Sequence, residues 1–430
     1  MKIKINRSIA KGTITAPPSK SMAHRMIICA ALCDGVSVIE NVDLSQDIEA
    51  TIDCIKTLGA KVSVKGNSVT VDGSDTVIQK FVRQDRKDSD DDLNNMSDKT
   101  DISDFNFFCR ESGSTMRFFM GIAMALPLIS EFHGSETLLN RPFGIYEKIL
   151  NSDKASKENV FFEKKDDRIV IRGGIDTDSF EVEGNISSQF ITGLLFAVSL
   201  KGKGGVIKLI PPVESRSYIN LTLQSLKCFG TDADWLDENT LKIEADSHFV
   251  NRTISVEGDY SNAAFLDAFT ILGGSVNVEG LNENSLQGDK VYKDYFEKLS
   301  KEKATLDIAD CPDLGPVLFA VAAAKHGGMF TSTARLKIKE SDRAGVMCEE
   351  LAKFGVKTIV KENSVEICEG NLSTPECEIE GHNDHRIVMS LSLLLTLTGG
   401  VINEAEAVRK SYPGFFDDIE KLGIVFEKIS

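Results

Sequence analysis

The sequence lacks the cysteine and histidine spacings on which metal sites and disulfide frameworks are built. Its nine cysteines are scattered over 430 residues without a CxxC pair, and its six histidines include no HExxH. Zinc sites and secreted disulfide scaffolds depend on such spacings. We therefore expect that no cysteine ligates a metal or forms a structural disulfide, and that the protein lies in a reducing cytoplasm.

Long apolar runs and an excess of positive charge are also missing. The longest apolar runs, 116–129 and 387–397, fall short of the roughly 18 residues of a membrane-spanning helix, and MKIKINRSIAKG has no signal-peptide core. Acidic residues outnumber basic ones by 65 to 49, which argues against a nucleic-acid binder. No GxxxxGK[ST] occurs, and no GxGxxG opens a helix, so neither a P-loop nor a dinucleotide site is supported.

What the sequence does contain is an internal repeat. A polar start, an apolar helix rich in small residues, a glycine and a strand recur six times, beginning at Ser21, Ser114, Ser187, Ser261, Asp313 and Asp384. An amphipathic helix and an alternating hairpin, such as 61–71 and 357–368, follow most copies. The repeat is thus helix–strand–helix–strand–strand, and the fourth copy is too short for a full hairpin. Because one core of 430 residues is implausible, the pattern predicts an α/β protein with two domains of three repeats each.

Cations stand at the starts of the apolar helices, where the helix dipole disfavours them. Lys20, Arg25, Arg117 and Arg386 fall in apolar first turns. An anion bound at a helix N-terminus would explain them, whereas the serines and acids beside them are ordinary caps. Further cations stand near the starts of the second helices, namely Arg141, Arg216, Lys339, Arg343 and Lys410. In an acidic chain this predicts one or two sites for anionic ligands, with independent surface salt bridges as the alternative for each residue alone.

Two acids lie among these cations. Asp313 stands at a buried helix start, and Glu340 stands between Lys339 and Arg343. Neighbouring cations keep a carboxylate ionised at neutral pH and fix its orientation, as acid–base catalysis requires. The alternative for each acid is a helix cap or an ion pair. We interpret His385 as a packed first-turn histidine.

Eight motifs occur in order between residues 15 and 416: APPSKSMAHR, GSTMR, NRPF, SSQF, ESRSY, IKESDR, NDHRIVM and RKSYP. Together they resemble the 5-enolpyruvylshikimate-3-phosphate synthases, a resemblance that covers essentially the whole chain. It implies transfer of the enolpyruvyl group of phosphoenolpyruvate to the 5-hydroxyl of 3-phosphoshikimate, through a tetrahedral intermediate and with release of phosphate. This reaction belongs to the shikimate pathway towards chorismate and the aromatic amino acids, and glyphosate inhibits it.

The resemblance also implies a fold and a setting. The fold would be a two-domain inside-out α/β barrel, with the site between the domains and facing the helix N-termini. Domain I would comprise 1–18 plus 257–430, and domain II 19–256. The latter contains an insertion at 85–104 with eight Asp, which predicts a solvated loop. No metal, cofactor, nucleic acid or membrane is implied, and we expect a cytoplasmic monomer whose partners are its small-molecule substrates.

Residue roles follow from the resemblance alone. It makes Asp313 the base on the attacking hydroxyl, and Glu340 or Lys20 the group that moves a proton to and from the methylene carbon. For 3-phosphoshikimate it implies Lys20, Ser21, Arg25, Ser187, Ser188, Gln189, Ser215, Tyr218, Asp313 and Lys339. For phosphoenolpyruvate it implies Lys20, Gly113, Arg117, Arg141, Gln189, Arg343, Arg386 and Lys410.

Two departures and two alternatives remain open. Glu111 stands where the family often has Asn, and Arg335 where it often has Asn or His, so neither receives a role. The related enolpyruvyl transferase that acts on UDP-N-acetylglucosamine uses a loop cysteine, for which Cys109 and Cys311 are the nearest candidates. A non-catalytic phosphosugar-binding relative is the alternative of another class; Lys20, Asp313 and Glu340 argue against it.

Overall fold

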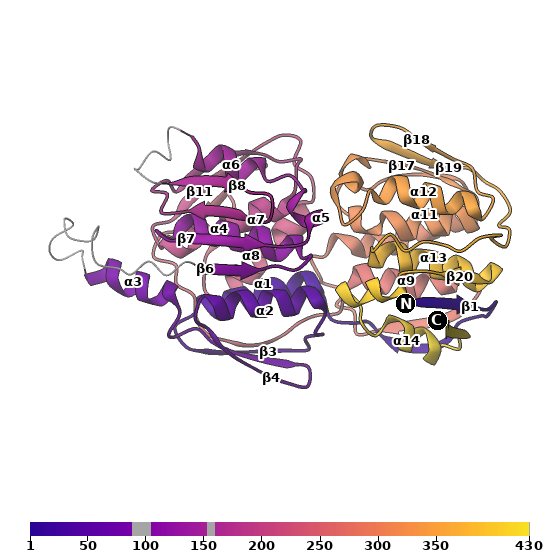
Figure 1. Ribbon diagram of the computed structural model, residues 1–430, viewed down its shortest axis with the longest axis horizontal. Helices are drawn as coiled ribbons and strands as arrows, with labels where there is room; N and C mark the ends of the chain where they lie inside the picture. Colours follow the sequence, from indigo (N-terminus) through magenta and orange to yellow (C-terminus); the bar gives the residue numbers. More distant parts are fainter. Residues whose placement is uncertain (88–104, 153–159, 430) are drawn as a thin grey trace. The chain divides into compact units, whose positions relative to one another are not determined.

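The computed structural model describes residues 1–87, 105–152 and 160–429 (Figure 1). The chain divides into two compact units, which we call unit 1 (Met1–Ser19 with Glu257–Ser430) and unit 2 (Lys20–Val256). Each unit has its own cluster of buried apolar side chains. Two separate cores are the arrangement expected of a chain of this length.

Unit 2 contains three repeats among its described residues. The first consists of α1 (Lys20–Leu32), β3 (Val36–Glu40), α2 (Gln46–Thr57), β4 (Lys61–Lys65) and β5 (Ser68–Asp72). The second consists of α4 (Gly113–Ala125), β7 (Ile129–His133), α5 (Glu136–Leu139), α6 (Gly144–Leu150), β8 (Phe161–Lys164) and β9 (Ile169–Arg172). The third consists of α7 (Ser188–Lys201), β11 (Gly205–Ile210), α8 (Arg216–Cys228), β12 (Ala233–Trp235) and β13 (Thr240–Ile243). Connecting elements are α3 (Val77–Lys87), β6 (Phe105–Phe108), β10 (Ser179–Glu183) and β14 (Thr253–Ser255).

Unit 1 holds the fourth to sixth repeats. The fourth consists of α9 (Tyr260–Ile271), β15 (Ser275–Glu279), α10 (Tyr292–Lys301) and β16 (Ala304–Asp307). The fifth consists of α11 (Gly315–Ala324), β17 (Gly328–Thr331), α12 (Arg343–Lys353), β18 (Thr358–Val360) and β19 (Ser364–Ile367). The sixth consists of α13 (His385–Thr398), β20 (Gly400–Ile402), α14 (Phe415–Lys421) and β21 (Phe426–Ile429). The N-terminal strands are β1 (Lys2–Ile5) and β2 (Lys11–Thr15), and the 3₁₀ turns are η2 (Gly288–Val291), η3 (Pro312–Leu314), η4 (Ala334–Ile338) and η5 (Ala405–Lys410).

The four-stranded sheets share one order. In each, the first strand of a repeat pairs in parallel with a strand from outside that repeat and antiparallel with its own hairpin, as in β10-β11-β13-β12 and β16-β17-β19-β18. The sheet β14-β3-β5-β4 follows the same rule, because β14 from the end of unit 2 pairs with β3 from its start. The first and third repeats of unit 2 are thereby joined through the last strand of the unit.

The sixth repeat ends without a hairpin of its own, and the N-terminus completes its sheet. Strand β1 lies antiparallel between β20 and β21, with Ile3 opposite both Ile402 and Lys428. Strand β2 pairs in parallel with β15 of the fourth repeat. These pairings join residues hundreds of positions apart, which is why the repeat pattern alone did not predict them.

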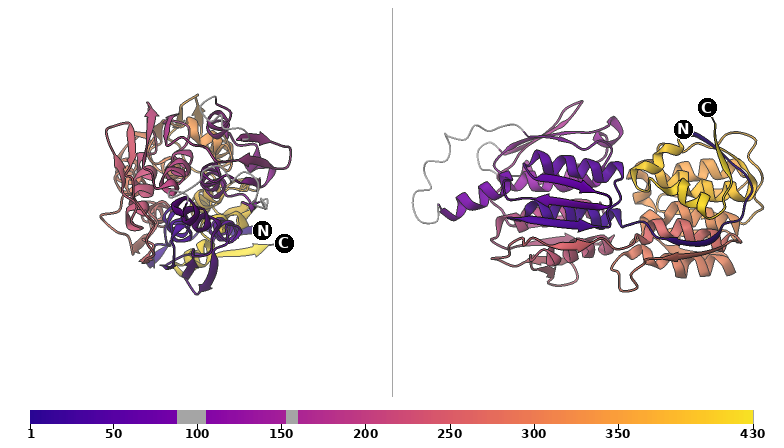
Figure 2. Two further views of the ribbon diagram at one scale, coloured as in Figure 1. Left: turned by 90° about the vertical axis from the view of Figure 1, so that its left-hand side faces the viewer. Right: turned by 90° about the horizontal axis from the view of Figure 1, so that it is seen from below.

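The apolar helices lie inside the units. Helices α1, α4 and α7 in unit 2, and α9, α11 and α13 in unit 1, are buried over almost their whole length, while the sheets lie around them (Figure 2). Helices α4 and α7 pass so closely that a Cβ on Gly121 would lie 2.2 Å from the Gly193 carbonyl oxygen. Only glycine permits such an approach of two backbones.

The Asp-rich insertion is described only at its beginning. Residues 85–87 end helix α3, so the insertion starts in a helix and not in the expected loop. Residues 88–104 lie outside the described residues.

Candidate active site

In unit 2, the N-terminal halves of α1, α7 and α8 meet around Arg25. Its Nε donates to Thr222 Oγ1 at 2.8 Å, and its Nη2 donates to Thr192 Oγ1 at 3.3 Å and to the Tyr218 carbonyl at 3.1 Å. Burial lowers the pKa of Arg25 to about 10, so the guanidinium stays charged at neutral pH. Each of these acceptors is neutral, which leaves the positive charge available to an anion.

Helix α4 brings a second arginine to the same helix starts. Arg117 Nη1 donates to Gln189 Oε1 at 2.6 Å, and Gln189 Nε2 donates to Ser114 Oγ at 2.9 Å. The Arg117 guanidinium also lies 5.1 Å from the centre of the Phe190 ring. These contacts hold the cation across the first turns of α4 and α7, where their dipoles favour negative charge.

Gly113 is the first residue of α4, and two guanidinium groups converge on it. A Cβ added there would lie 2.8 Å from Arg141 Nη1 and 2.9 Å from Arg117 Nη1. Its φ lies outside the left-handed region, so a simple turn requirement does not explain the glycine. Arg141 Nε is buried without a hydrogen-bond partner among the described residues. The glycine therefore leaves the two cations room beside the helix N-terminus.

Lys20 is held by an acid that the sequence analysis did not single out. Its Nζ lies 2.7 Å from Oδ2 of Asp47 at the start of α2. Nearby, His24 Nδ1 lies 2.7 Å from Thr51 Oγ1, which lies 2.8 Å from Thr115 Oγ1, so α1, α2 and α4 are linked. Burial, and after it the charge of Lys20, holds the pKa of His24 well below its usual value.

The serine candidates stand at the same helix starts. Ser21 lies in the first turn of α1, and its carbonyl accepts from Arg25 Nη1 at 2.6 Å. Ser187 caps α7 by accepting from the Gln189 N–H at 3.3 Å, and the buried Ser188 follows it. Ser215 precedes α8 with a φ of 56°. The structure thus brings the unit 2 candidates together at the starts of four helices.

In unit 1 the candidates gather around Asp313. Its Oδ1 lies 3.1 Å from Lys339 Nζ and 2.9 Å from Arg343 Nη1, and its Oδ2 lies 3.0 Å from Arg386 Nη2. Burial alone would raise the pKa of Asp313, but Arg386, Lys339 and Arg343 outweigh it and hold the pKa well below its usual value. Burial in turn lowers the pKa of Lys339. The carboxylate is therefore ionised at neutral pH.

Arg343, the first residue of α12, joins three acids. Besides Asp313 it contacts Glu340 Oε2 at 2.5 Å through Nη2, and Asp384 Oδ2 at 2.8 Å through Nε. Asp384, which also caps α13 by accepting from the Arg386 N–H, is fully buried. In the sequence it was indistinguishable from an ordinary cap, because the arginine it holds lies 41 positions away.

The remaining unit 1 candidates are also placed. Arg386 Nη1 donates to Ser261 Oγ at 2.7 Å, and Lys410 Nζ donates to the Asn383 carbonyl at 2.5 Å. Arg335 is buried and donates to the Ala309 carbonyl at 2.5 Å. His385 is buried in the first turn of α13, as expected.

The two cysteines nearest to the motifs do not resemble a catalytic loop thiol. Cys109 and Cys311, the candidates nearest to the motifs, are both buried. Burial raises the pKa of Cys311, which keeps its thiol protonated and unreactive at neutral pH. Cys29 and Cys33 are free, buried thiols.

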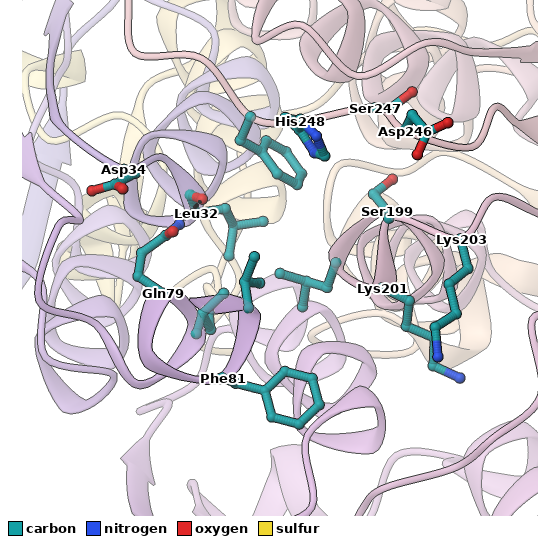
Figure 3. Close-up of a pocket in the computed structure, with 15 residues that line it drawn as sticks. Leu32, Asp34, Gln79, Phe81, Ser199, Lys201, Lys203, Asp246, Ser247 and His248 are labelled. Atoms are coloured by element: carbon teal, nitrogen blue, oxygen red, sulfur yellow. Dashed lines mark hydrogen bonds between the residues drawn. The ribbon is translucent and has the colours of Figure 1, made fainter. Parts of the chain in front are cut away.

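A cavity of about 580 Å³ in unit 2 lies away from these residues (Figure 3). It is lined by residues at the C-terminal ends of α1 and α7, such as Leu32 and Lys201, and by Phe81 of α3. The candidate residues stand at the opposite, N-terminal ends of α1 and α7. The cavity therefore does not belong to the candidate active site.

Comparison with known proteins decides the family. The sequence model of the family described as EPSP synthase (3-phosphoshikimate 1-carboxyvinyltransferase) matches residues 6–419. The chain belongs to this family. A 3-phosphoshikimate 1-carboxyvinyltransferase of Clostridium kluyveri is 34% identical over 442 residues, which cover 98% of this chain and 97% of that protein. The corresponding protein of Clostridium acetobutylicum is 36% identical over 440 residues, with 98% and 97% covered.

Solved structures agree on the fold. An EPSP synthase from Acinetobacter baumannii superposes with a TM-score of 0.74 at 21% identity and covers 100% of both chains. The expected EPSP synthase resemblance and the two-domain inside-out α/β fold are thus confirmed, and the UDP-N-acetylglucosamine alternative is not favoured. Among the described residues, no helix has both the length and the apolar character needed to cross a membrane.

Proposed function

We propose that the clusters around Arg117 and Asp313 carry the reaction of the EPSP synthase family, enolpyruvyl transfer from phosphoenolpyruvate to 3-phosphoshikimate. Both substrates combine a phosphate with a carboxylate, so bringing them together requires many cations. The observation that supports the proposal most strongly is the set of buried cations at helix N-termini in a chain of net charge −16. Arg343 and Arg386 are paired with acids, but Arg25 is buried among neutral acceptors, and a buried cation of this kind is costly without an anionic ligand.

Substrate binding is assigned residue by residue. We assign 3-phosphoshikimate to Lys20, Ser21, Arg25, Ser187, Ser188, Gln189, Ser215, Tyr218, Asp313 and Lys339. We assign phosphoenolpyruvate to Lys20, Gly113, Arg117, Arg141, Gln189, Arg343, Arg386 and Lys410. Two observations support these assignments: the neutral acceptors around Arg25, and the buried Nε of Arg141, which has no hydrogen-bond partner within the described part of the chain.

In the described contacts, Asp313 is too strongly paired to act as a base, and substrate binding changes this. Its partners Lys339, Arg343 and Arg386 are the cations that we assign to the substrate anions. When those anions compete for the cations, the pKa of Asp313 rises towards the range in which a carboxylate accepts a proton. The substrates therefore activate the base that acts on them.

The reaction then needs one base and one acid. Asp313 removes the proton of the 5-hydroxyl as its oxygen bonds to C2 of phosphoenolpyruvate, and Glu340 or Lys20 protonates C3, which gives the tetrahedral adduct. Removal of a proton from the new methyl group and departure of phosphate from C2 restore the double bond. Glu340 lies beside Arg343 and Lys20 beside Asp47, so each proton-transfer candidate is oriented by a partner.

The proposal also covers the domain boundaries, the cellular compartment and the oligomeric state. We assign unit 1 and unit 2 to the two domains of three repeats, with boundaries next to Ser19 and Glu257. The protein acts in the cytoplasm as a monomer on its two small-molecule substrates. No other partner is required by the reaction.

Phosphate release tests the function. The protein is expected to release phosphate only when phosphoenolpyruvate and 3-phosphoshikimate are both present. UDP-N-acetylglucosamine is expected not to replace 3-phosphoshikimate, and a thiol reagent is expected to leave turnover intact because Cys109 and Cys311 are buried. Loss of turnover through modification of one cysteine would favour the related transferase. Binding of both substrates without phosphate release would favour a non-catalytic relative.

Replacing Gly113 by Ala should weaken phosphoenolpyruvate binding, because the new methyl group would lie 2.8–2.9 Å from two guanidinium nitrogens and push them aside. We expect the KM for phosphoenolpyruvate to rise about tenfold, equivalent to about 1.4 kcal/mol. The inhibition constant of glyphosate, a somewhat longer molecule, should rise further. Steady-state kinetics with both ligands measures the two shifts.

Gly144→Ala is the matched control. Gly144 also begins a helix, but a Cβ there meets no atom within 4 Å. This variant should retain both constants. Equal shifts for substrate and inhibitor in Gly113→Ala would remove Gly113 from the pocket.

A further inference from the structure

Glu350 is a fully buried acid to which the proposed reaction assigns no role. It lies in the last turns of α12, the helix that begins at Arg343. Its Oε1 lies 2.9 Å from His382 Nε2, and its Oε2 accepts from the Glu380 N–H at 3.0 Å. Lys353 Nζ lies 2.9 Å from the same carboxylate. A buried carboxylate with donors on every side is costly to build, and such groups hold their partners in one arrangement.

Two of the three partners of Glu350, Glu380 and His382, belong to a strained loop. His382 and Asn383 are consecutive non-glycine residues with φ values of 50° and 49°. Each such residue costs on the order of 1 kcal/mol and persists only where its surroundings hold it. Glu350 fixes the His382 side chain, and Glu404 Oε2 accepts from the Asn383 N–H at 2.8 Å. Two acids on different segments therefore hold the loop from both sides.

The loop determines where two substrate-binding cations lie. The Asn383 carbonyl accepts from Lys410 Nζ at 2.5 Å, so the direction of this carbonyl places the ammonium group. Asp384 follows and caps α13 at the Arg386 N–H. If residues 382–383 relaxed to negative φ, the carbonyl would turn and the start of α13 would shift.

We propose that Glu350 is a positioning residue for phosphoenolpyruvate, which acts by holding the 380–384 loop so that Lys410 and Arg386 are pre-organised. The inference rests on the proposed function, since it takes the two cations as phosphoenolpyruvate ligands. Glu350 touches neither substrate. Its effect is on binding, because the cations keep their charge and lose only their fixed position.

Glu350→Gln tests the proposal with little change of shape. A glutamine has one acceptor oxygen and presents an NH₂ group to donors, so it cannot satisfy His382, Lys353 and the Glu380 N–H together. We expect the KM for phosphoenolpyruvate to rise about tenfold, with the KM for 3-phosphoshikimate unchanged and kcat within about threefold. Glu349→Gln removes the same charge from the neighbouring, exposed position and should behave as wild type.

The pattern of constants separates positioning from a purely structural role. A variant that is only less stable has less active enzyme, so its apparent kcat falls while both KM values stay the same. That result, or an equal rise of both KM values, would overturn the proposal. His382→Ala removes the same contact from the loop side, because alanine has no side-chain donor. It should reproduce the selective rise of the KM for phosphoenolpyruvate, and if Glu350→Gln does not fold, an unchanged KM in His382→Ala overturns the proposal.

Direct binding keeps this test independent of turnover. Calorimetry with phosphoenolpyruvate on the folded proteins should show weaker binding in Glu350→Gln than in Glu349→Gln. Equal binding would refute the role of Glu350. A wild-type protein that binds phosphoenolpyruvate but releases no phosphate would instead contradict the proposed function. The comparison of binding between the two variants would still test the positioning role of Glu350.

Discussion

Replacing Asp313 by Asn should lower kcat by roughly two orders of magnitude or more, as loss of a general base does. The amide cannot accept the proton of the 5-hydroxyl, whereas it keeps the size of the carboxylate and one acceptor oxygen. Lys339, Arg343 and Arg386 keep their charges and become more available to substrate anions. The KM values should therefore stay the same or fall. Steady-state kinetics with phosphate detection gives both constants.

Asp310→Asn is the control, because Asp310 is an exposed acid just before the same turn and is not among the candidates. It should retain wild-type turnover. If Asp313→Asn kept its kcat, Asp313 would have no part in proton transfer. If both KM values rose strongly with kcat little changed, Asp313 would be a binding residue only.

The same substitution has a predictable effect on stability against pH. The pKa of Asp313 is lower in the folded protein than its ordinary value of 3.8. The ionised carboxylate therefore stabilises the fold above about pH 4, and this contribution is lost as the pH falls through the folded-state pKa. The difference in unfolding free energy between wild type and Asp313→Asn should be constant from pH 7 to pH 5 and shrink below pH 4. Denaturant unfolding at these pH values measures it.

The sequence predicted the cations of the site well and their partners poorly. Arg25, Arg117 and Arg386 could be recognised because a cation in an apolar first turn conflicts with local rules, and such conflicts mark functional positions. Asp47 and Asp384 conflict with nothing, since acids at helix starts are normal caps. Only the fold shows that Asp47 meets Lys20 and that Asp384 meets Arg343.

The strand pairing of the repeats also shows that local features can be predicted from the sequence and long-range partners cannot. The hairpins at 61–71 and 357–368 were predictable because both strands lie in one short window. The insertion of β1 between β20 and β21 was not, because it pairs the two ends of the chain. Periodicity describes each strand, but which strand lies beside it depends on the packing of the whole unit.

Replacing Arg343 by Met should have the largest effect on stability. Arg343 is 1% exposed and contacts the carboxylates of Asp313, Glu340 and Asp384. Without the cation these acids are left close together, with Asp384 fully buried. Removing one partner of a buried ion pair costs about 3–5 kcal/mol, so we expect a loss of at least this size in denaturant unfolding at pH 7. The unfolding free energy of Arg343→Lys should lie between those of the wild type and Arg343→Met, because one ammonium group cannot contact three acids as the forked guanidinium does.

A control and a rescue separate this effect from the loss of one packed side chain. Arg409→Met makes the same change at an exposed arginine of unit 1 and should cost little. Adding Asp384→Asn to Arg343→Met removes the most deeply buried acid, so part of the lost stability should return. If the double variant were less stable than Arg343→Met by the full cost of Asp384→Asn alone, the two residues would not be coupled. Arg343 would then stabilise unit 1 through packing. The explanation that it stabilises the fold by neutralising the three acids would be wrong.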